Sequence, residues 1–204
     1  MIFLRYESFR GYLRMYPVTA GIIAINILIY FIDLLSGNHA LLQRGIFFSS
    51  PDQNHFSLSE PWRYVTAVFL HLDFQHVFFN MFAILIFAPP LERMLGHIRY
   101  AVFYLLCGIV GNLFSALAEP VSMGAGASGA IYGIYGAFLY LAVMKKSLDD
   151  ASRKTVYTIL IFGLIYSIFV PGIGIWAHVG GLFAGFVFGY GYDRYLFSKQ
   201  NRHR

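Results

Sequence analysis

The chain has 204 residues, of which 58% are hydrophobic and only 12% are charged. Soluble domains carry about 25% charged residues, so this chain has too little polar surface for a soluble globular fold. Its net charge is +5, but the basic residues flank apolar segments instead of forming a stripe, which argues against a nucleic-acid-binding protein. Composition therefore predicts a membrane protein.

Six apolar segments are long enough, or nearly so, to cross a bilayer as helices, which takes about 20 residues with a range of ~17–25. They predict an all-α polytopic membrane protein with one domain over residues 1–204. The expected spans cover approximately residues 17–36, 74–91, 98–117, 127–144, 155–170 and 174–192. Pro89-Pro90 interrupts the second span, and we expect a bend there.

The positions of the basic residues predict the orientation of the spans. Thirteen of the 15 Lys and Arg precede the first span, follow the sixth, or lie in the loops after the second and fourth spans. Only Arg44 and Arg63 lie on the opposite side, in the long loop of residues 37–72. By the positive-inside rule, both termini are cytoplasmic. No cleavable signal peptide is expected, because the first apolar segment exceeds the ~7–15 residues of a signal core.

Ser128 and His178 are the candidate catalytic residues. Ser128 lies in Gly126-Ala127-Ser128-Gly129 at the start of the fourth span, where backbone N–H groups lack helical partners and can stabilise an oxyanion. His178 lies inside the sixth span, where an ionisable side chain marks a candidate functional site. A serine with a neutral histidine supplies a nucleophile and its base. The alternative is purely structural, with Ser128 at a helix contact and His178 as a buried polar residue.

His76 and Asn80 are four residues apart on the second span and therefore share one helix face. Both side chains can donate hydrogen bonds, as an oxyanion hole requires. His71 lies just before this span. Glycines on the fourth and sixth spans, such as Gly129 and Gly181, favour close packing of those two helices. The alternative is that the polar side chains only cross-link helices.

In order and spacing, these residues resemble the rhomboid family of intramembrane serine proteases, over roughly residues 60–190. The matching pieces are Trp62-Arg63, His71, His76-x-x-x-Asn80, Glu92, Gly126-Ala127-Ser128-Gly129 with Tyr132, and Ala177-His178-x-x-Gly181-x-x-x-Gly185. The resemblance implies a rhomboid-like bundle of six helices and a Ser–His dyad without a third, acidic member.

The resemblance also implies roles for individual residues. Ser128 would be the nucleophile and His178 the general base. The backbone N–H of Ser128 and the side chains of His76 and Asn80 would form the oxyanion hole. Tyr132 would pack against the ring of His178. Supporting roles would fall to Gly126, Gly129, His71, Trp62 and Arg63, the last two as structural members of the long loop. Asp73 receives no role and is expected to be a surface residue.

The primary functional hypothesis is a site-specific endopeptidase that cuts single-span membrane proteins near their outer end. Its partners are then transmembrane protein substrates and membrane lipid, without nucleic acid, and no metal or organic cofactor is implied. The minimal architecture favours a bacterial plasma (cytoplasmic) membrane. The alternative is a non-catalytic rhomboid-like protein that binds membrane clients. A transporter or channel is a third reading, which the apolar run Met81–Phe87 disfavours. The sequence leaves the oligomeric state open.

Overall fold

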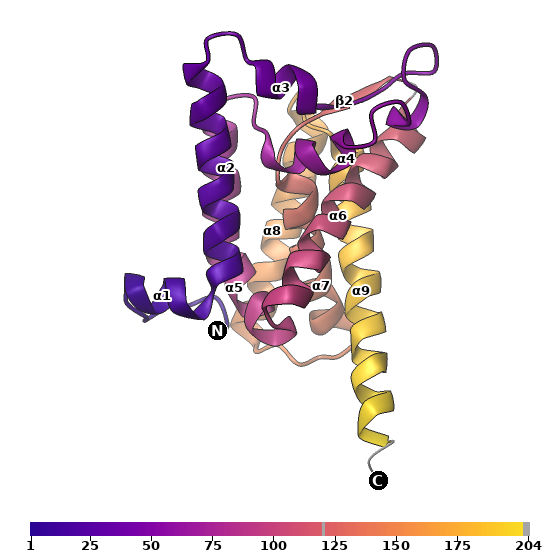
Figure 1. The fold of residues 1–204 in the computed structure, drawn as a ribbon. Helices are drawn as coiled ribbons and strands as arrows, with labels where there is room; N and C mark the ends of the chain where they lie inside the picture. The colour runs from indigo at the N-terminus through magenta and orange to yellow at the C-terminus, as the bar shows by residue number, and fades with distance from the viewer. Residues whose placement is uncertain (120, 202–204) are drawn as a thin grey trace.

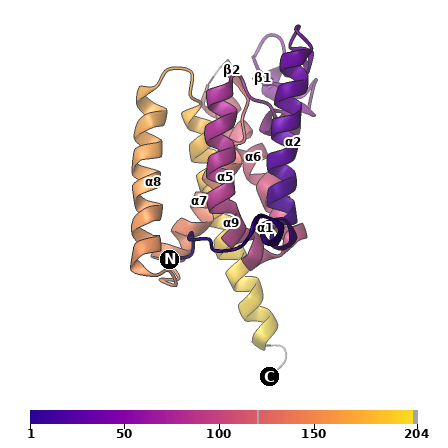
Figure 2. The same cartoon turned by 90° about the vertical axis from the view of Figure 1, so that its left-hand side faces the viewer.

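The structure is a computed structural model that describes residues 1–119 and 121–201, with side chains described through residue 193 outside that gap. Six long helices stand side by side, and the N-terminal segment and the last turns of the final helix lie at one end of this bundle, here called the terminal end (Figures 1 and 2). The long helices are α2 (Pro17–Leu35), α5 (Phe74–Leu95), α6 (His97–Ala118), α7 (Ser128–Val143), α8 (Asp150–Phe169) and α9 (Ile175–Asn201). The fold is mostly helical, as predicted.

Short elements complete the chain. At the terminal end lies α1 (Phe9–Met15), and the others gather at the opposite end, here called the loop end (Figure 1). The loop-end elements are α3 (Ala40–Gly45), β1 (Phe47–Ser49), α4 (Arg63–Thr66), β2 (Ser122–Gly124) and the 3₁₀ helices η1 (His55–Ser57) and η2 (Ala67–Phe69). The strands β1 and β2 pair antiparallel, with Phe47 opposite Gly124. The all-α prediction had omitted this small sheet.

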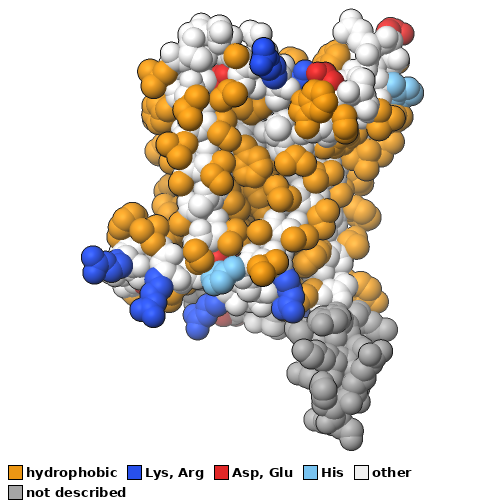
Figure 3. All heavy atoms as spheres, in the orientation of Figure 1, with side chains coloured by type: hydrophobic (Ala, Val, Ile, Leu, Met, Phe, Trp, Pro, Cys, Tyr) orange, Lys and Arg blue, Asp and Glu red, His pale blue; other side chains and the backbone are white. Residues whose placement is uncertain are grey.

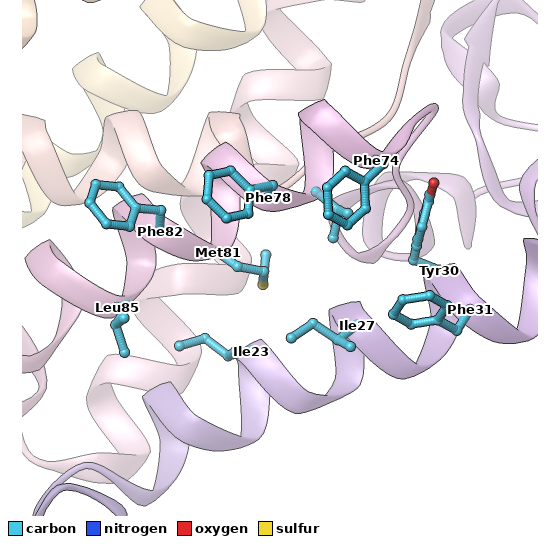
Figure 4. A pocket seen from close by; sticks show the side chains of 10 residues that line it. Ile23, Ile27, Tyr30, Phe31, Phe74, Phe78, Met81, Phe82 and Leu85 are labelled. Carbon is cyan, nitrogen blue, oxygen red and sulfur yellow. The ribbon is translucent and has the colours of Figure 1, made fainter. Parts of the chain in front are cut away.

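The outside of the bundle is apolar. Three helices in the described part of the chain, α2, α5 and α6, are long and apolar enough to cross a membrane, with mean hydropathies of 2.2, 1.5 and 2.0. Large apolar side chains cover the face seen in Figure 3. An apolar groove of about 310 Å³ also runs between α2 and α5, lined by Ile27 on one side and by Phe78 and Phe82 on the other (Figure 4). Such a surface suits lipid and is too extensive for a soluble monomer.

Helix α7 forms the core of the bundle, with 12 of its 16 residues buried. Its backbone touches that of α9: a Cβ atom on Gly181 would overlap the carbonyl oxygen of Gly129. One turn further, a Cβ atom on Gly185 would overlap the carbonyl oxygen of Gly133. The glycine-bearing faces of the fourth and sixth expected spans therefore meet, and only residues without side chains allow so close an approach.

Helix α8 begins earlier than the expected span at residue 155. Asp149 caps it by accepting hydrogen bonds from the backbone N–H of Ser152 at 3.0 Å and from the Ser152 hydroxyl at 2.6 Å. These hydrogen bonds lower the pKa of Asp149 to about 2, so the cap is ionised at neutral pH. An anionic cap suits the positive end of a helix, which explains why the helix extends into this polar segment.

Glu92 is fully buried at the terminal end of α5 and caps a different helix, α2. Its carboxylate accepts hydrogen bonds from the backbone N–H groups of Val18 and Thr19 at 3.1 and 2.8 Å. The Thr19 hydroxyl donates to it at 2.5 Å, and Nδ1 of His97 lies 2.6 Å away. The first turn of α2 therefore obtains its missing acceptors from another helix.

Pro89-Pro90 lies inside α5, which runs as one helix to Leu95 rather than ending at residue 91. The two prolines cannot donate to the carbonyls four residues earlier, those of Leu85 and Ile86. The Tyr12 hydroxyl donates to the Leu85 carbonyl at 3.3 Å, and Nη2 of Arg5 donates to the Ile86 carbonyl at 3.1 Å. The N-terminal segment thus satisfies the carbonyls that the prolines leave free.

Replacing Glu92 by alanine should destabilise the bundle. Each buried donor left without an acceptor costs ~1–3 kcal/mol, and two backbone donors lose theirs, so we expect a loss of at least about 2 kcal/mol. Thermal unfolding in detergent would measure it. Glu119→Ala is the matched control, since the Glu119 side chain has no hydrogen bond or ion pair within the described residues, and its one backbone bond to the Ser115 carbonyl survives the change. Equal unfolding temperatures for the two variants would contradict this role of Glu92.

A double-mutant cycle should reveal the link between Arg5 and Pro90. Arg5→Ala leaves the Ile86 carbonyl without a donor, and we expect a loss of about 1–3 kcal/mol. In a Pro90→Ala background, residue 90 regains an N–H that can donate to that carbonyl, so the same change should cost less. Other contacts of Arg5 cancel in the cycle. A cost of Arg5→Ala that is the same in both backgrounds would refute the link.

Candidate active site

Ser128 is the first residue of α7 and is partly exposed at the loop end of the bundle. The segment before it is anchored to the long loop of residues 37–72, because β2 pairs with β1 and the Gly126 N–H donates to the Ala67 carbonyl at 2.9 Å. Ala127, next to Ser128, is fully buried. The position of the Ser128 hydroxyl is therefore set by a helix on one side and a pinned loop on the other.

Gly126 lies between Ser128 and His76. Its φ of +127° is a conformation that favours glycine. A Cβ atom placed on it would lie 2.6 Å from Nε2 of His76 and 3.8 Å from Oγ of Ser128. The His76 ring nitrogen and the Ser128 hydroxyl therefore border the same small space, which stays open because residue 126 has no side chain.

His76 and Asn80 lie on the first two turns of α5. Asp73 caps this helix, because its carboxylate accepts a hydrogen bond from the His76 backbone N–H at 2.7 Å. The cap fixes the start of the helix and thereby the position of His76 in its first turn. Asn80 is buried, and its Nδ2 donates to the His76 carbonyl at 2.8 Å. That bond uses one of its two amide hydrogens, so the other remains available for a second acceptor.

The imidazole of His178 is held from two sides near the start of α9. The Tyr132 ring lies parallel to it, with centroids 4.1 Å apart and planes at 8°. Its Nδ1 lies 2.7 Å from Oγ of Ser167, which belongs to α8. His178 is only 7% exposed, so few conformations are open to it. Its Nε2 is left as the ring nitrogen that can approach Ser128.

Ser128 and His178 are neighbours through their helices. A Cβ atom on Gly129, the residue after Ser128, would lie 3.6 Å from the carbonyl oxygen of Ala177, the residue before His178. No hydrogen bond joins the two side chains themselves in the described structure. Catalytic hydrogen bonds are often long without substrate and tighten when it binds, so this spacing is compatible with a nucleophile and its base.

His71 is a second imidazole beside His76. Their ring centroids are 4.9 Å apart at 72°, and His71 is only 4% exposed. Burial, together with the smaller effect of the neighbouring His76, lowers the pKa of His71 to about 3, so the ring is neutral at neutral pH. Neither of its ring nitrogens has a hydrogen-bond partner within the described residues. His71 thus contributes a neutral, buried wall next to His76.

Trp62 and Arg63 lie in the long loop and hold its backbone. Nε1 of Trp62 donates to the Arg44 carbonyl at 3.2 Å. Arg63 is buried, donates to the Ile46 carbonyl at 2.7 Å and pairs with the Glu60 carboxylate at 2.7 and 3.1 Å. None of these contacts involves Ser128 or His178. Their link to the site is indirect, through β1 and its partner strand β2.

The sequence reasoning missed Ser167 as a neighbour of His178 and Asp73 as the cap of α5. Asp73 is exposed as expected, but an aspartate directly before an apolar helix is a helix-cap signal that could have been used. Ser167 offered only a weaker signal, a lone hydroxyl in an apolar segment. Nothing in its spacing connects it to His178. Within the described residues, no three His, Cys, Asp or Glu side chains gather as a metal site.

The chain is similar to known proteins along most of its length. The family model described as Rhomboid domain matches residues 58–195. YdcA of Bacillus subtilis (strain 168) is 34% identical over 188 residues, covering 91% of this chain and 94% of YdcA. YdcA is named as a rhomboid protease. The rhomboid protease GluP of the same organism is 33% identical over 165 residues, covering 80% of this chain but only 32% of GluP.

A plant protein is similar over a shorter region. RHOMBOID-like protein 6, mitochondrial, of Arabidopsis thaliana is 35% identical over 142 residues, covering 65% of this chain and 44% of that protein. The matched family region contains every residue of the site, from Trp62 to His178. The apolar helices, the site at their loop end and these matches together establish that the chain belongs to the rhomboid family.

Proposed function

We propose that this protein is an intramembrane serine endopeptidase that hydrolyses peptide bonds of single-span membrane proteins near their outer end. Two observations support the proposal: the Ser128 hydroxyl and Nε2 of His76 border one small space, and the residue after Ser128 packs against the residue before His178. Tyr132 and Ser167 contact the His178 ring. The family membership supports a protease, since YdcA and GluP carry rhomboid protease names.

In the proposed reaction, the Ser128 hydroxyl attacks the scissile carbonyl and passes its proton to Nε2 of His178. The resulting oxyanion accepts hydrogen bonds from the Ser128 backbone N–H and from His76 and Asn80. His178 then gives the proton to the leaving amine, and the peptide bond breaks to form an acyl-enzyme on Ser128. A water molecule, deprotonated by His178, hydrolyses that ester and restores both side chains.

We further propose one domain over residues 1–204, with six spans formed by α2, α5, α6, α7, α8 and α9. Both termini then face the cytoplasm, because 13 of 15 Lys and Arg precede the first span, follow the sixth, or lie between the second and third or the fourth and fifth spans in the sequence. The loop end and Ser128 would face outward. A bacterial plasma membrane is the proposed location, and membrane lipid and transmembrane substrates are the proposed partners.

The substrate must present an extended peptide to this site. Carbonyls within an intact helix are hydrogen-bonded and shielded, so a transmembrane substrate has to unwind locally before Ser128 can attack. Helix-weakening residues at the cut site, such as glycine, lower the cost of unwinding by about 1 kcal/mol each relative to alanine. We therefore expect cleavage where such residues lie near the outer end of the substrate helix.

Covalent labelling by a fluorophosphonate probe tests the nucleophile without knowledge of the natural substrate. Wild type should be labelled, and both Ser128→Ala and His178→Ala should lose the label and at least roughly 10³-fold of substrate cleavage. Ser122→Ala, six residues before Ser128, is the control and should keep both. Labelling of a folded Ser128→Ala variant would contradict the assignment. A folded wild type that neither reacts nor cleaves would instead indicate a client-binding protein.

Gly126→Ala should damage the oxyanion hole while Ser128 and His178 stay in place. The added Cβ atom would collide with Nε2 of His76 and require a left-handed backbone. We expect kcat for a model transmembrane substrate to fall roughly 10²–10³-fold, as when one oxyanion donor is removed. Gly124→Ala is the matched control, since a Cβ there meets nothing within 4 Å. Equal kcat values for the two variants would rule out this role.

A further inference from the structure

Ser167 lies on α8, is only 4% exposed, and makes two short contacts. Its Oγ is 2.7 Å from Nδ1 of His178, on a different helix. The same Oγ is 2.7 Å from the carbonyl oxygen of Gly163, one turn earlier on its own helix. The Tyr132 hydroxyl, at 3.4 Å, is a third neighbour. The hydroxyl of Ser167 therefore connects α8 to the His178 ring.

The positions of the hydrogen atoms follow from these contacts. A serine hydroxyl has one hydrogen to donate and two lone pairs to accept with, whereas a carbonyl oxygen can only accept. The geometry allows Ser167 to donate to the Gly163 carbonyl, and in that arrangement its lone pairs are left for His178 and Tyr132. Nδ1 of His178 then donates to Ser167 and carries the ring hydrogen. A neutral imidazole has only one, so Nε2 is then a free base.

We propose that Ser167 is a positioning residue for the protease reaction, which holds His178 in the tautomer that carries its hydrogen on Nδ1. This inference rests on the proposed function of Ser128 and His178. The neutral Ser167 hydroxyl would take the place of the carboxylate that orients the histidine in other serine proteases. Without Ser167, the ring can place its hydrogen on Nε2, where it cannot take the proton of Ser128.

The inference also ties the reaction to the position of α8. This helix stands at the edge of the bundle (Figure 2), whereas Ser128 and His178 belong to the tightly joined pair α7 and α9. Gly163 lets α8 approach, since a Cβ atom there would lie 2.5 Å from the Tyr132 hydroxyl. A movement of α8 away from the joined pair α7 and α9 lengthens the contact between Ser167 and His178. The His178 ring is then no longer held in one tautomer.

The test compares wild type, Ser167→Ala and Ser167→Thr as folded, purified full-length protein. Nitrogen-15 NMR of histidine-labelled protein reports which ring nitrogen carries the hydrogen, and the signal of His178 is the one that His178→Ala loses. We expect an Nδ1-protonated ring in wild type and a larger Nε2-protonated fraction in Ser167→Ala. Threonine, which keeps a hydroxyl, should restore the wild-type state.

Kinetics on a model transmembrane substrate give the second readout. Ser167→Ala should lower kcat roughly 10- to 100-fold, the usual effect of removing a group that orients a histidine, with little change in KM. Thr155→Val is the matched control: Thr155 makes the same bond to the carbonyl one turn earlier, at 2.9 Å, but contacts no histidine among the described residues. It should leave kcat and the tautomer unchanged.

Two results would overturn the inference: an Nε2-protonated His178 in wild type, or an unchanged tautomer and kcat in Ser167→Ala. The first needs no Ser167 variant, only His178→Ala to assign the signal, so it remains decisive even if the Ser167 variants fail to fold. Failure of the proposed function looks different: either Ser128→Ala keeps its probe labelling and cleavage, or a folded wild type shows neither. The tautomer measurement would still report whether Ser167 orients His178.

Discussion

The backbone contact between α7 and α9 is the constraint on which the rest of the site depends. Lipid gives helices no hydrophobic reason to associate, so close packing of small residues has to hold them together. Gly129 and Gly181 lie at the loop end of this contact, and Ser128 and His178 stand beside them on either helix. The two proposed catalytic groups therefore flank a contact between helix backbones, and the spacing of their helices is set by backbone atoms rather than by flexible side chains.

A second constraint is that every backbone polar group inside a membrane needs a partner. The bundle meets it across helices: Glu92 of α5 accepts the first N–H groups of α2, and Arg5 satisfies a carbonyl that Pro90 leaves free. Ser167 follows the same rule, because its hydroxyl contacts the Gly163 carbonyl of its own helix and Nδ1 of His178 on another helix. Polar side chains at these depths act mainly as connections between helices.

The loop end shows how separate parts of the chain meet at one serine. The segment before Ser128 is pinned by β1 and by the Ala67 carbonyl, and both belong to the long loop that Arg63 stabilises. Asp73 caps α5 and so sets the position of His76 along the helix axis. Long loops are usually mobile or functional. Here the loop anchors the segment before Ser128, whose hydroxyl borders the same space as His76.

The sequence by itself determined the membrane class, the approximate helices and the family, because a bilayer demands long apolar runs and the Ser128 and His178 motifs stand out within them. Helix ends and caps were less predictable: Asp149 and Asp73 extend or start helices through local hydrogen bonds. Only the tertiary structure decided the pairing of β1 with β2 and the contact of Ser167 with His178. Those partners lie on separate elements without a shared periodicity, so their meeting depends on how the helices pack.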